Sequence, residues 1–139
     1  SQQPAFTSTP QVCSAPPAFA MAGIGPADVD VLALYDPFTI AALMQIEDMG
    51  FCPKGEGGRF VEGSALDFDG GRLPYNTHGG LLSFGHSGVA GGMAHPVEAF
   101  RQLAGRAGDR QIAPRRRAFG HADGGVLSSH VSLVFARED

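Results

Sequence analysis

A short apolar run that leads directly into an amphipathic helix constrains the fold of this chain more than any other feature. Residues 28–35 are mostly apolar and end just before Pro37, which is typical of a strand buried on both faces. Asp36 can cap a helix, and apolar side chains then recur at helical spacing from Phe38 until Gly50. A buried strand followed at once by a helix is the unit from which parallel sheets with packed helices are built.

The remaining elements extend this pattern along the chain. Within residues 12–21 we predict a helix that Pro16 and Pro17 restrict to a piece starting there and that ends at Gly23 or Gly25. The other predicted elements are a surface loop over residues 51–75, a short strand running into a glycine turn within 76–92, a helix over 96–103, and two strands over 117–122 and 126–135. Asp123-Gly124-Gly125 is a hairpin signal between the last two strands.

This order of elements predicts the α/β class, with a mixed sheet, helices packed on it and a C-terminal antiparallel hairpin. A length of 139 residues fits one domain. We assign residues 11–139 to that domain and residues 1–10, which are polar and hold two prolines, to a linker.

Charge and cysteine content exclude several classes of partner. Fourteen acidic against ten basic side chains give a net charge of -4, which argues against nucleic acid or an anionic membrane as the main partner. No apolar run is long enough to span a membrane, and no secretory signal is evident. Because the two cysteines lie in unrelated contexts, we expect a reduced, cytoplasmic setting.

Residues 76–92 are the most informative stretch for function. They read Asn-Thr-His-Gly-Gly-Leu-Leu-Ser-Phe-Gly-His-Ser-Gly-Val-Ala-Gly-Gly. This spacing resembles the thiolase signature, in which Asn-x-x-Gly-Gly is followed by Gly-His-x-x-Gly-x-x-Gly. Gly88 comes one residue earlier than in that pattern, whereas Gly92 meets its last position.

Three other segments carry the same resemblance in the same order. Tyr35-Asp-Pro-Phe-Thr39 is similar to the His-Asp-Cys-Phe-Thr segment of sterol-carrier-type thiolases, and residues 50–58 are similar to the loop that follows it there. Asp123-Gly-Gly125 resembles the closing Gly-Gly turn. The resemblance implies the C-terminal half of a thiolase-superfamily protein, nearest to the sterol-carrier or lipid-transfer-protein type thiolases and related steroid side-chain aldolases.

The chain departs from the family at its cysteines. In thiolases the nucleophilic cysteine belongs to the N-terminal half, and neither Cys13 nor Cys52 lies in a segment that resembles its site. A second family cysteine precedes the closing Gly-Gly turn, and Ala122 or its neighbours stand there, as in the sterol-carrier-type branch. These departures argue against ordinary Claisen condensation.

His86 and Tyr35 are the predicted catalytic residues. His86 can donate a hydrogen bond to a thioester oxygen or activate a cysteine delivered by the other half; the alternative is a turn histidine bonded to a local carbonyl. Tyr35 stands where the family has Asn or His, and its phenol can donate to an oxyanion or carry a proton. A tyrosine here suits the retro-aldol cleavage of steroid side-chain aldolases; the alternative is a tyrosine packed at a sheet edge.

The resemblance also assigns residues to substrate binding, namely Asn76, His78, Gly85, Gly124 and Gly125. A solvent-facing loop is the alternative for His78. We expect His95 to cap or decorate a helix start and the basic run 115–117 to be a solvated strand start, with a phosphate contact to coenzyme A as its alternative. His121 and His130 flank the hairpin without a metal-binding framework, so we predict no metal site.

Two functions remain open from the sequence. In the first, the chain is part of an acyltransferase or retro-aldolase that acts on coenzyme A thioesters, with no covalently bound cofactor. An N-terminal thiolase half would complete the site, the protein would form a homo-oligomer, and a small OB-fold protein can act as a further partner. In the second, the chain is a non-catalytic module that binds acyl-CoA, lipid or a partner.

The start of the chain also bears on its activity. The family's C-terminal half begins with a strand, whereas this chain opens at a predicted helix. We therefore expect the sequence to be a piece of a longer protein and the isolated chain to be inactive.

Overall fold

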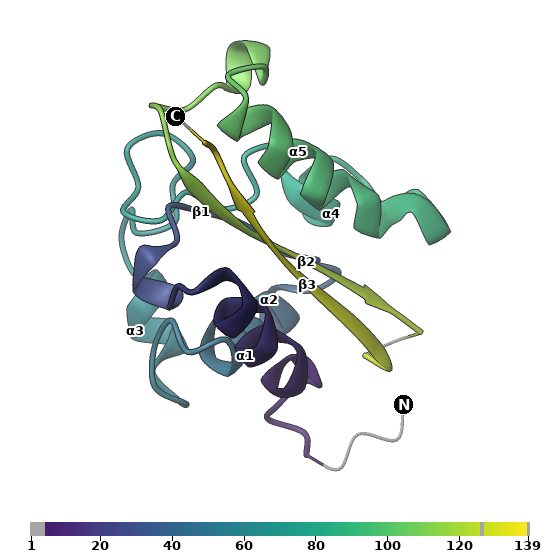
Figure 1. Cartoon of the computed structure of the whole chain (residues 1–139). Helices are drawn as coiled ribbons and strands as arrows, with labels where there is room; N and C mark the ends of the chain where they lie inside the picture. Colours follow the sequence, from purple (N-terminus) through teal and green to yellow (C-terminus); the bar gives the residue numbers. More distant parts are fainter. Residues whose placement is uncertain (1–4, 126, 139) are drawn as a thin grey trace.

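A three-stranded mixed sheet lies at the centre of the computed structural model, which describes residues 5–125 and 127–138 (Figure 1). Its strand order is β1 (Val31–Ala33), β2 (Arg117–Gly124) and β3 (Ser129–Ala136). β1 pairs with β2 in parallel, and β2 pairs with β3 antiparallel. An isolated parallel bridge joins Leu32 to Tyr75 beside β1.

Helices cover both faces of this sheet (Figure 1). On one face, α1 (Gln11–Ala22) and α2 (Thr39–Asp48) contribute buried side chains to a core that includes Leu32 and Phe119. On the other face, α5 (Ala94–Leu103) packs against a second buried cluster that includes Val31. Because both faces are covered, all three residues of β1 are buried, as the apolar run predicted. The predicted α/β fold class is confirmed.

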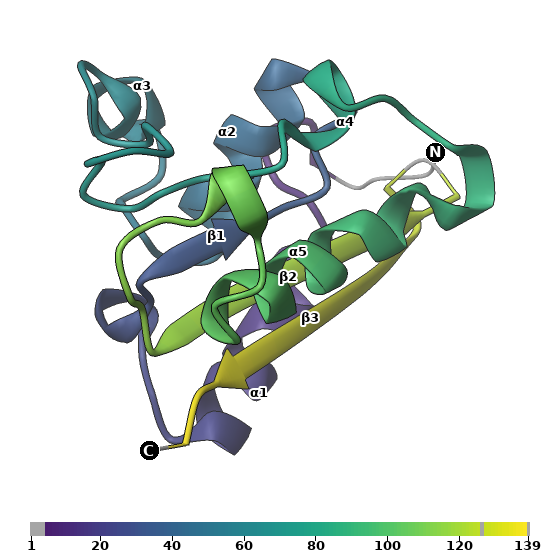
Figure 2. The ribbon, with the colours of Figure 1, turned by 90° about the horizontal axis from the view of Figure 1, so that it is seen from above.

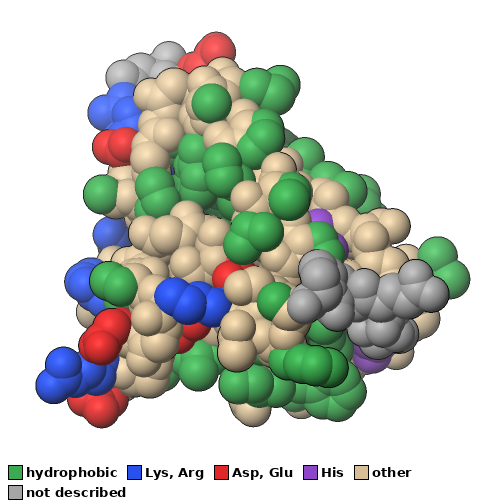
Figure 3. Space-filling view, turned by 90° about the horizontal axis from the view of Figure 1, so that it is seen from below, with side chains coloured by type: hydrophobic (Ala, Val, Ile, Leu, Met, Phe, Trp, Pro, Cys, Tyr) green, Lys and Arg blue, Asp and Glu red, His purple; other side chains and the backbone are tan. Residues whose placement is uncertain are grey.

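The shorter helices lie in the connections. They are η1 (Pro26–Asp28), α3 (Gly57–Val61), α4 (Gly80–Ser83), η2 (Gly88–Met93) and η3 (Gly108–Arg110). Seen from above, the chain leaves α4, reaches one end of the sheet at η2, and returns along the strands as α5 (Figure 2). From below, hydrophobic side chains cover much of the visible face, and charged side chains gather mainly to one side (Figure 3).

The strand predicted within residues 76–92 is wrong. The structure describes all of residues 76–92 and has no strand among them. The isolated bridge lies just before them at Tyr75, the Asn76 N–H donates to the Leu32 carbonyl at 2.8 Å, and the chain then forms the short helix α4. Gly79 and Gly80 take positive φ angles of 102° and 64°, which turn the chain away from the sheet. The Leu81 N–H then donates to the buried carboxylate of Asp36 at 2.7 Å, so a partner distant in sequence stabilises a helical turn there.

The predicted start of the first helix is also wrong. α1 begins at Gln11, and both Pro16 and Pro17 lie inside it. Each proline removes one helical hydrogen bond, yet burial of Ala15 and Phe19 against the core holds the helix together across this point. Its predicted end at Gly23 is confirmed by a left-handed cap with φ 65°.

The surface loop predicted over residues 51–75 is wrong in part. It contains the helix α3, whose first N–H, that of Gly57, donates to Glu47 Oε1 on α2 at 2.9 Å, and it ends at the bridge residue Tyr75.

The remaining predicted helices and strands agree with the structure apart from their ends. The helices expected after Asp36 and at residues 96–103 form α2 and α5, and the hairpin forms β2 and β3. β3 begins at Ser129, whereas the predicted strand began at Val126, which lies outside the described residues.

The linker assignment for residues 1–10 stays a prediction, since residues 1–4 are outside the described part. Phe6 is exposed, whereas Thr9 is buried and its N–H donates to Asp48 Oδ2 at 2.6 Å. Each helix in the described ranges is too short or too polar to cross a bilayer.

Candidate functional site

The carboxyl end of β1 and the amino end of α2 place Tyr35 in a small cavity beside His86. The cavity has a volume of about 210 Å³. Its lining residues come from three separate parts of the chain: Tyr35, Pro37, Phe38 and Ala41 around the start of α2, His86 between α4 and η2, and Asp123, Gly125 and Leu127 at the tip of the hairpin. Both residues that the sequence predicted to be catalytic therefore line one cavity.

A hydrogen bond joins these two side chains. The Tyr35 hydroxyl oxygen lies 2.6 Å from His86 Nε2, and the rings meet edge to face with centroids 5.8 Å apart. The Gly88 N–H donates to His86 Nδ1 at 2.9 Å. Because Nδ1 accepts this bond, a neutral imidazole carries its hydrogen on Nε2 and donates it to the Tyr35 oxygen. The hydroxyl hydrogen of Tyr35 is then left to donate to a ligand in the cavity.

The surroundings of Tyr35 keep its phenol protonated. Burial raises the pKa of Tyr35, and the negative charge of Asp123 raises that pKa further. Tyr35 is buried, whereas His86 is exposed at the mouth of the site. The arrangement therefore presents a hydrogen-bond donor inside and an imidazole at the solvent side.

Asn76 fixes the strand end that carries Tyr35. Its Oδ1 accepts the Leu34 N–H at 2.8 Å, and its Nδ2 donates to the Leu34 carbonyl at 2.8 Å. Gln45 on α2 donates to the Tyr35 carbonyl at 2.7 Å. Both ends of the Asn76 amide thus serve the backbone, and its assignment to substrate binding stays a prediction.

Asp36 connects the site to α4. The sequence suggested that Asp36 caps α2, but the N-cap of α2 is Phe38 and makes no side-chain bond. Asp36 instead accepts the Leu81 N–H, and a Cβ at Gly80 would overlap its carboxylate. Burial raises the pKa of Asp36 despite the hydrogen bonds that favour its charged form. This contact anchors the segment that leads to His86.

His95 lies directly behind Tyr35, a placement that sequence reasoning missed. It sits in the first turn of α5, as expected for a residue at a helix start, but it is fully buried. Its ring centroid is 5.9 Å from that of Tyr35, and its Nε2 is 3.9 Å from Asp36 Oδ1. Burial, with His78 as a smaller contribution, lowers the pKa of His95 to about 3.

A periodic signal for His95 was present in the sequence. Residues 95, 98, 99 and 102 follow the spacing of one helix face, and all four are buried. His78 is half-buried with its ring centroid 5.1 Å from that of His95, and it is not among the residues that line the cavity.

Of the three glycines assigned to substrate binding, one lines the cavity and two are next to residues that line it. Gly125 lines it, and Gly85 directly precedes His86 with a φ of 110°. Gly124 is the last residue of β2. Their roles in binding remain predictions.

Both cysteines lie away from this cavity. Cys13 is exposed on α1, and Cys52 follows α2 in the loop before α3. Burial raises the pKa of Cys52, and the charges of Glu47 and Glu56 raise it further, so its thiol is protonated near neutral pH.

The two hairpin histidines and the first residue of β2 make contacts within the chain. His121 Nε2 lies 2.8 Å from His130 Nδ1 across the hairpin. Among the described residues, no group of three or more histidine, cysteine or acidic side chains could hold a metal ion. Arg117 begins β2, as expected, and its N–H donates to Asp30 Oδ2 at 2.9 Å.

Sequence comparisons place these features in a known family. Residues 1–137 match the family described as thiolase C-terminal domain-like. The chain is 38% identical over 120 residues to an acetyl-CoA acetyltransferase of Methanothermobacter thermautotrophicus, covering 86% of this chain and 31% of that protein. It is 40% identical over 103 residues to sterol carrier protein 2 of Rattus norvegicus, covering 74% of this chain and 19% of that protein.

A solved structure has the same fold. It is described as Ltp2-ChsH2(DUF35) aldolase, with a TM-score of 0.82 and 32% identity, and the match covers 97% of this chain and 34% of that one. The chain thus spans about a third or less of each of these relatives. The predicted resemblance to sterol-carrier-type thiolases and related aldolases is confirmed.

Proposed function

Because this chain belongs to the thiolase C-terminal domain-like family, we propose that it supplies Tyr35 and His86 to an enzyme site for acyl-CoA thioesters. The observation that carries this proposal is the 2.6 Å contact between the Tyr35 hydroxyl and His86 Nε2 inside one cavity. A protonated phenol held by an imidazole is a fixed donor for an oxygen that gains charge during reaction. The substrate is a coenzyme A thioester, and no covalently bound cofactor is required.

Cleavage of a carbon-carbon bond in a β-hydroxyacyl thioester is the reaction that fits these groups. The hydroxyl loses its proton and becomes a carbonyl, while the electrons of the broken bond move to the thioester oxygen as an enolate. Tyr35 donates to that oxygen. Asp123 lines the same cavity and is the proton acceptor that this chain offers. The described lining holds a tyrosine and a carboxylate, and this pair can donate to the enolate oxygen and accept the hydroxyl proton.

The proposed enzyme needs a second half. Hydrophobic side chains are exposed along η2 and α5 at helical spacing: Val89, Met93, Val97 and Phe100. An N-terminal thiolase half packed on this row would bury it and close the cavity. On this proposal the isolated chain is inactive.

Further partners belong to the same proposal. The aldolase with the similar fold is named together with ChsH2(DUF35). By analogy, we propose that this protein binds a separate small OB-fold partner. We also propose that the full protein is a homo-oligomer and acts in the cytoplasm.

The test compares two reactions in the protein that contains this chain together with its N-terminal half. One assay follows the carbonyl product released from a β-hydroxyacyl-CoA, and the other follows the coenzyme A-dependent cleavage of a β-ketoacyl-CoA. We expect the first reaction and its loss in Asp123→Asn. Activity in the second assay alone would contradict the proposed cleavage, and binding without either reaction would indicate a non-catalytic module.

A further inference from the structure

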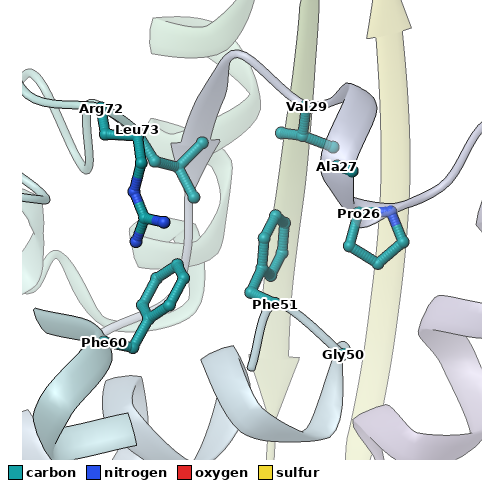
Figure 4. A pocket seen from close by; sticks show the side chains of 8 residues that line it. All are labelled: Pro26, Ala27, Val29, Gly50, Phe51, Phe60, Arg72 and Leu73. Atoms are coloured by element: carbon teal, nitrogen blue, oxygen red, sulfur yellow. The ribbon is translucent and has the colours of Figure 1, made fainter. Parts of the chain in front are cut away.

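A second cavity lies at the amino end of β1, whereas Tyr35 lies at its carboxyl end. It has a volume of about 350 Å³ and is lined by Pro26, Ala27, Val29, Gly50, Phe51, Phe60, Arg72 and Leu73 (Figure 4). Val29 precedes β1 and Gly50 follows α2, whereas Tyr35 follows β1 and precedes α2. The ten residues of α2 span roughly 15 Å, so the cavities at its two ends are separate.

Six of the eight residues that line this cavity have apolar side chains, and several of these are firmly held. Arg72, Leu73 and Phe60 lie on one side, Pro26, Ala27 and Val29 lie on the other, and the Phe51 ring stands between them (Figure 4). Phe51 packs edge-on against Phe19 of the core with ring centroids 6.4 Å apart. Val29 and Leu73 are themselves buried core residues. The apolar part of the cavity is therefore preformed.

Arg72 gives this cavity its charge. It is the one charged residue among the eight that line it, although the whole chain carries a net charge of -4. Its Cζ lies 4.5 Å from the centroid of the Phe60 ring, so the guanidinium rests on an aromatic face. Among the described residues, no hydrogen bond or ion pair occupies this guanidinium. Stacking uses only its face and leaves the N–H edges available.

We propose that this cavity binds a small apolar carboxylate. The two oxygens of the carboxylate would accept hydrogen bonds from two N–H groups of Arg72, because a planar guanidinium presents paired donors at the spacing of a carboxylate. The apolar body would lie against Phe51 and Leu73, and a cavity of this volume suits a body about the size of a phenyl ring with a short tether. An acetate ion carries the charge but lacks the apolar body, so it should bind more weakly. An amine of the same shape is positively charged and is repelled by Arg72.

The test uses 3-phenylpropionate as the probe and the longer protein that carries this chain, titrated by calorimetry and by ligand-observed NMR. The matched probes are 3-phenylpropanamide and 3-phenylpropylamine, which keep the body and change only the head group. We expect the carboxylate to bind at least about 10-fold more tightly than the amide, since an ionised partner strengthens a hydrogen bond, and the amine to bind more weakly than both.

Variants locate the site. Arg72→Gln should weaken 3-phenylpropionate binding by about 10-fold or more, and Arg72→Lys should recover only part of it because a lysine lacks the paired donors. Arg106→Gln is the matched control, since Arg106 is also exposed and lies outside the cavity lining. Melting temperatures confirm that each variant folds.

The outcomes separate clearly. Equal affinity for the carboxylate and the amide, or an unchanged affinity in Arg72→Gln, would overturn the proposal. The proposal would also be overturned if no binding were detected at about 10 mM probe, because a Kd above that concentration is too weak for specific recognition. Because Arg72 is outside the Tyr35 cavity, Arg72→Gln should not change thioester turnover, and failure of either site can be told from failure of the other.

Discussion

The hydroxyl oxygen of Tyr35 lies 2.6 Å from Nε2 of His86, although 51 residues separate the two in sequence. Tyr35 is positioned by the end of a central strand and His86 by the segment between α4 and η2. The contact therefore depends on the groups that hold both segments in place, chiefly Asn76 and Asp36. These supporting groups can be tested separately from the chemistry.

Replacement of Asn76 by alanine should lower the free energy of unfolding by about 2–6 kcal/mol. The change leaves the buried N–H and carbonyl of Leu34 without partners, and each unpaired group costs about 1–3 kcal/mol. Urea denaturation in the protein that carries this chain measures the loss. A loss below about 0.5 kcal/mol, the range of neutral surface changes, would show that the Asn76 clamp does not support the fold.

Replacement of Gly80 by alanine should destabilise α4 and move the segment that carries His86. The new Cβ would overlap the Asp36 carboxylate, and a φ of 64° is unfavourable for alanine. We expect a lower melting temperature and lower turnover. Gly58→Ala is the matched control because nothing lies within 4 Å of its Cβ position. Equal stability of the two variants would contradict the proposed anchor.

Acidification should destabilise the protein from about pH 6.5 downwards. Burial lowers the pKa of both His95 and His121 to about 3, so the unfolded chain binds more protons than the folded one between these values. Stability therefore falls as pH falls, by up to about 1.4 kcal/mol per pH unit for each group. His95→Gln should reduce the slope of unfolding free energy against pH between 6 and 4. An unchanged slope would contradict the buried neutral imidazole.

Replacement of His86 by alanine should lower kcat by about 100-fold or more while the protein stays folded. The imidazole is exposed and contributes little to the core, whereas its Nε2 holds the Tyr35 oxygen. Steady-state kinetics with a β-hydroxyacyl-CoA, together with a melting curve, measures both effects. A kcat within about 3-fold of the parent enzyme would exclude a role for His86 in the reaction.

Local patterns predicted the parts of the fold that depend on neighbouring residues. β1 and α2 follow from an apolar run, a helix-starting segment and Gly50, and the hairpin follows from alternation around a glycine turn. Across α1, burial of Phe19 outweighed the local cost of Pro16 and Pro17, which a local pattern could not reveal.

The motif resemblance singled out Tyr35 and His86, which the structure places in contact, but it did not predict the groups that support them. Asp36 bonds to Leu81 across 45 residues, and Asn76 bonds to Leu34 across 42. Such contacts depend on how separate segments pack, and no local spacing encodes them. His95 was accessible in principle through the buried face of α5, but its position behind Tyr35 follows from the packing of α5 on the sheet.

The most direct test of the account is the kcat of Tyr35→Phe on a β-hydroxyacyl-CoA, measured in the protein that contains this chain and its N-terminal half. The change removes only the hydroxyl, so packing should be preserved and the rate loss belongs to the oxygen. Tyr75→Phe is the matched control, since the Tyr75 hydroxyl is buried without a hydrogen-bond partner among the described residues and does not line the Tyr35 cavity. We predict a loss of about 10²-fold or more for Tyr35→Phe and an unchanged kcat for Tyr75→Phe. An unchanged kcat and melting temperature in Tyr35→Phe would contradict the catalytic role of Tyr35.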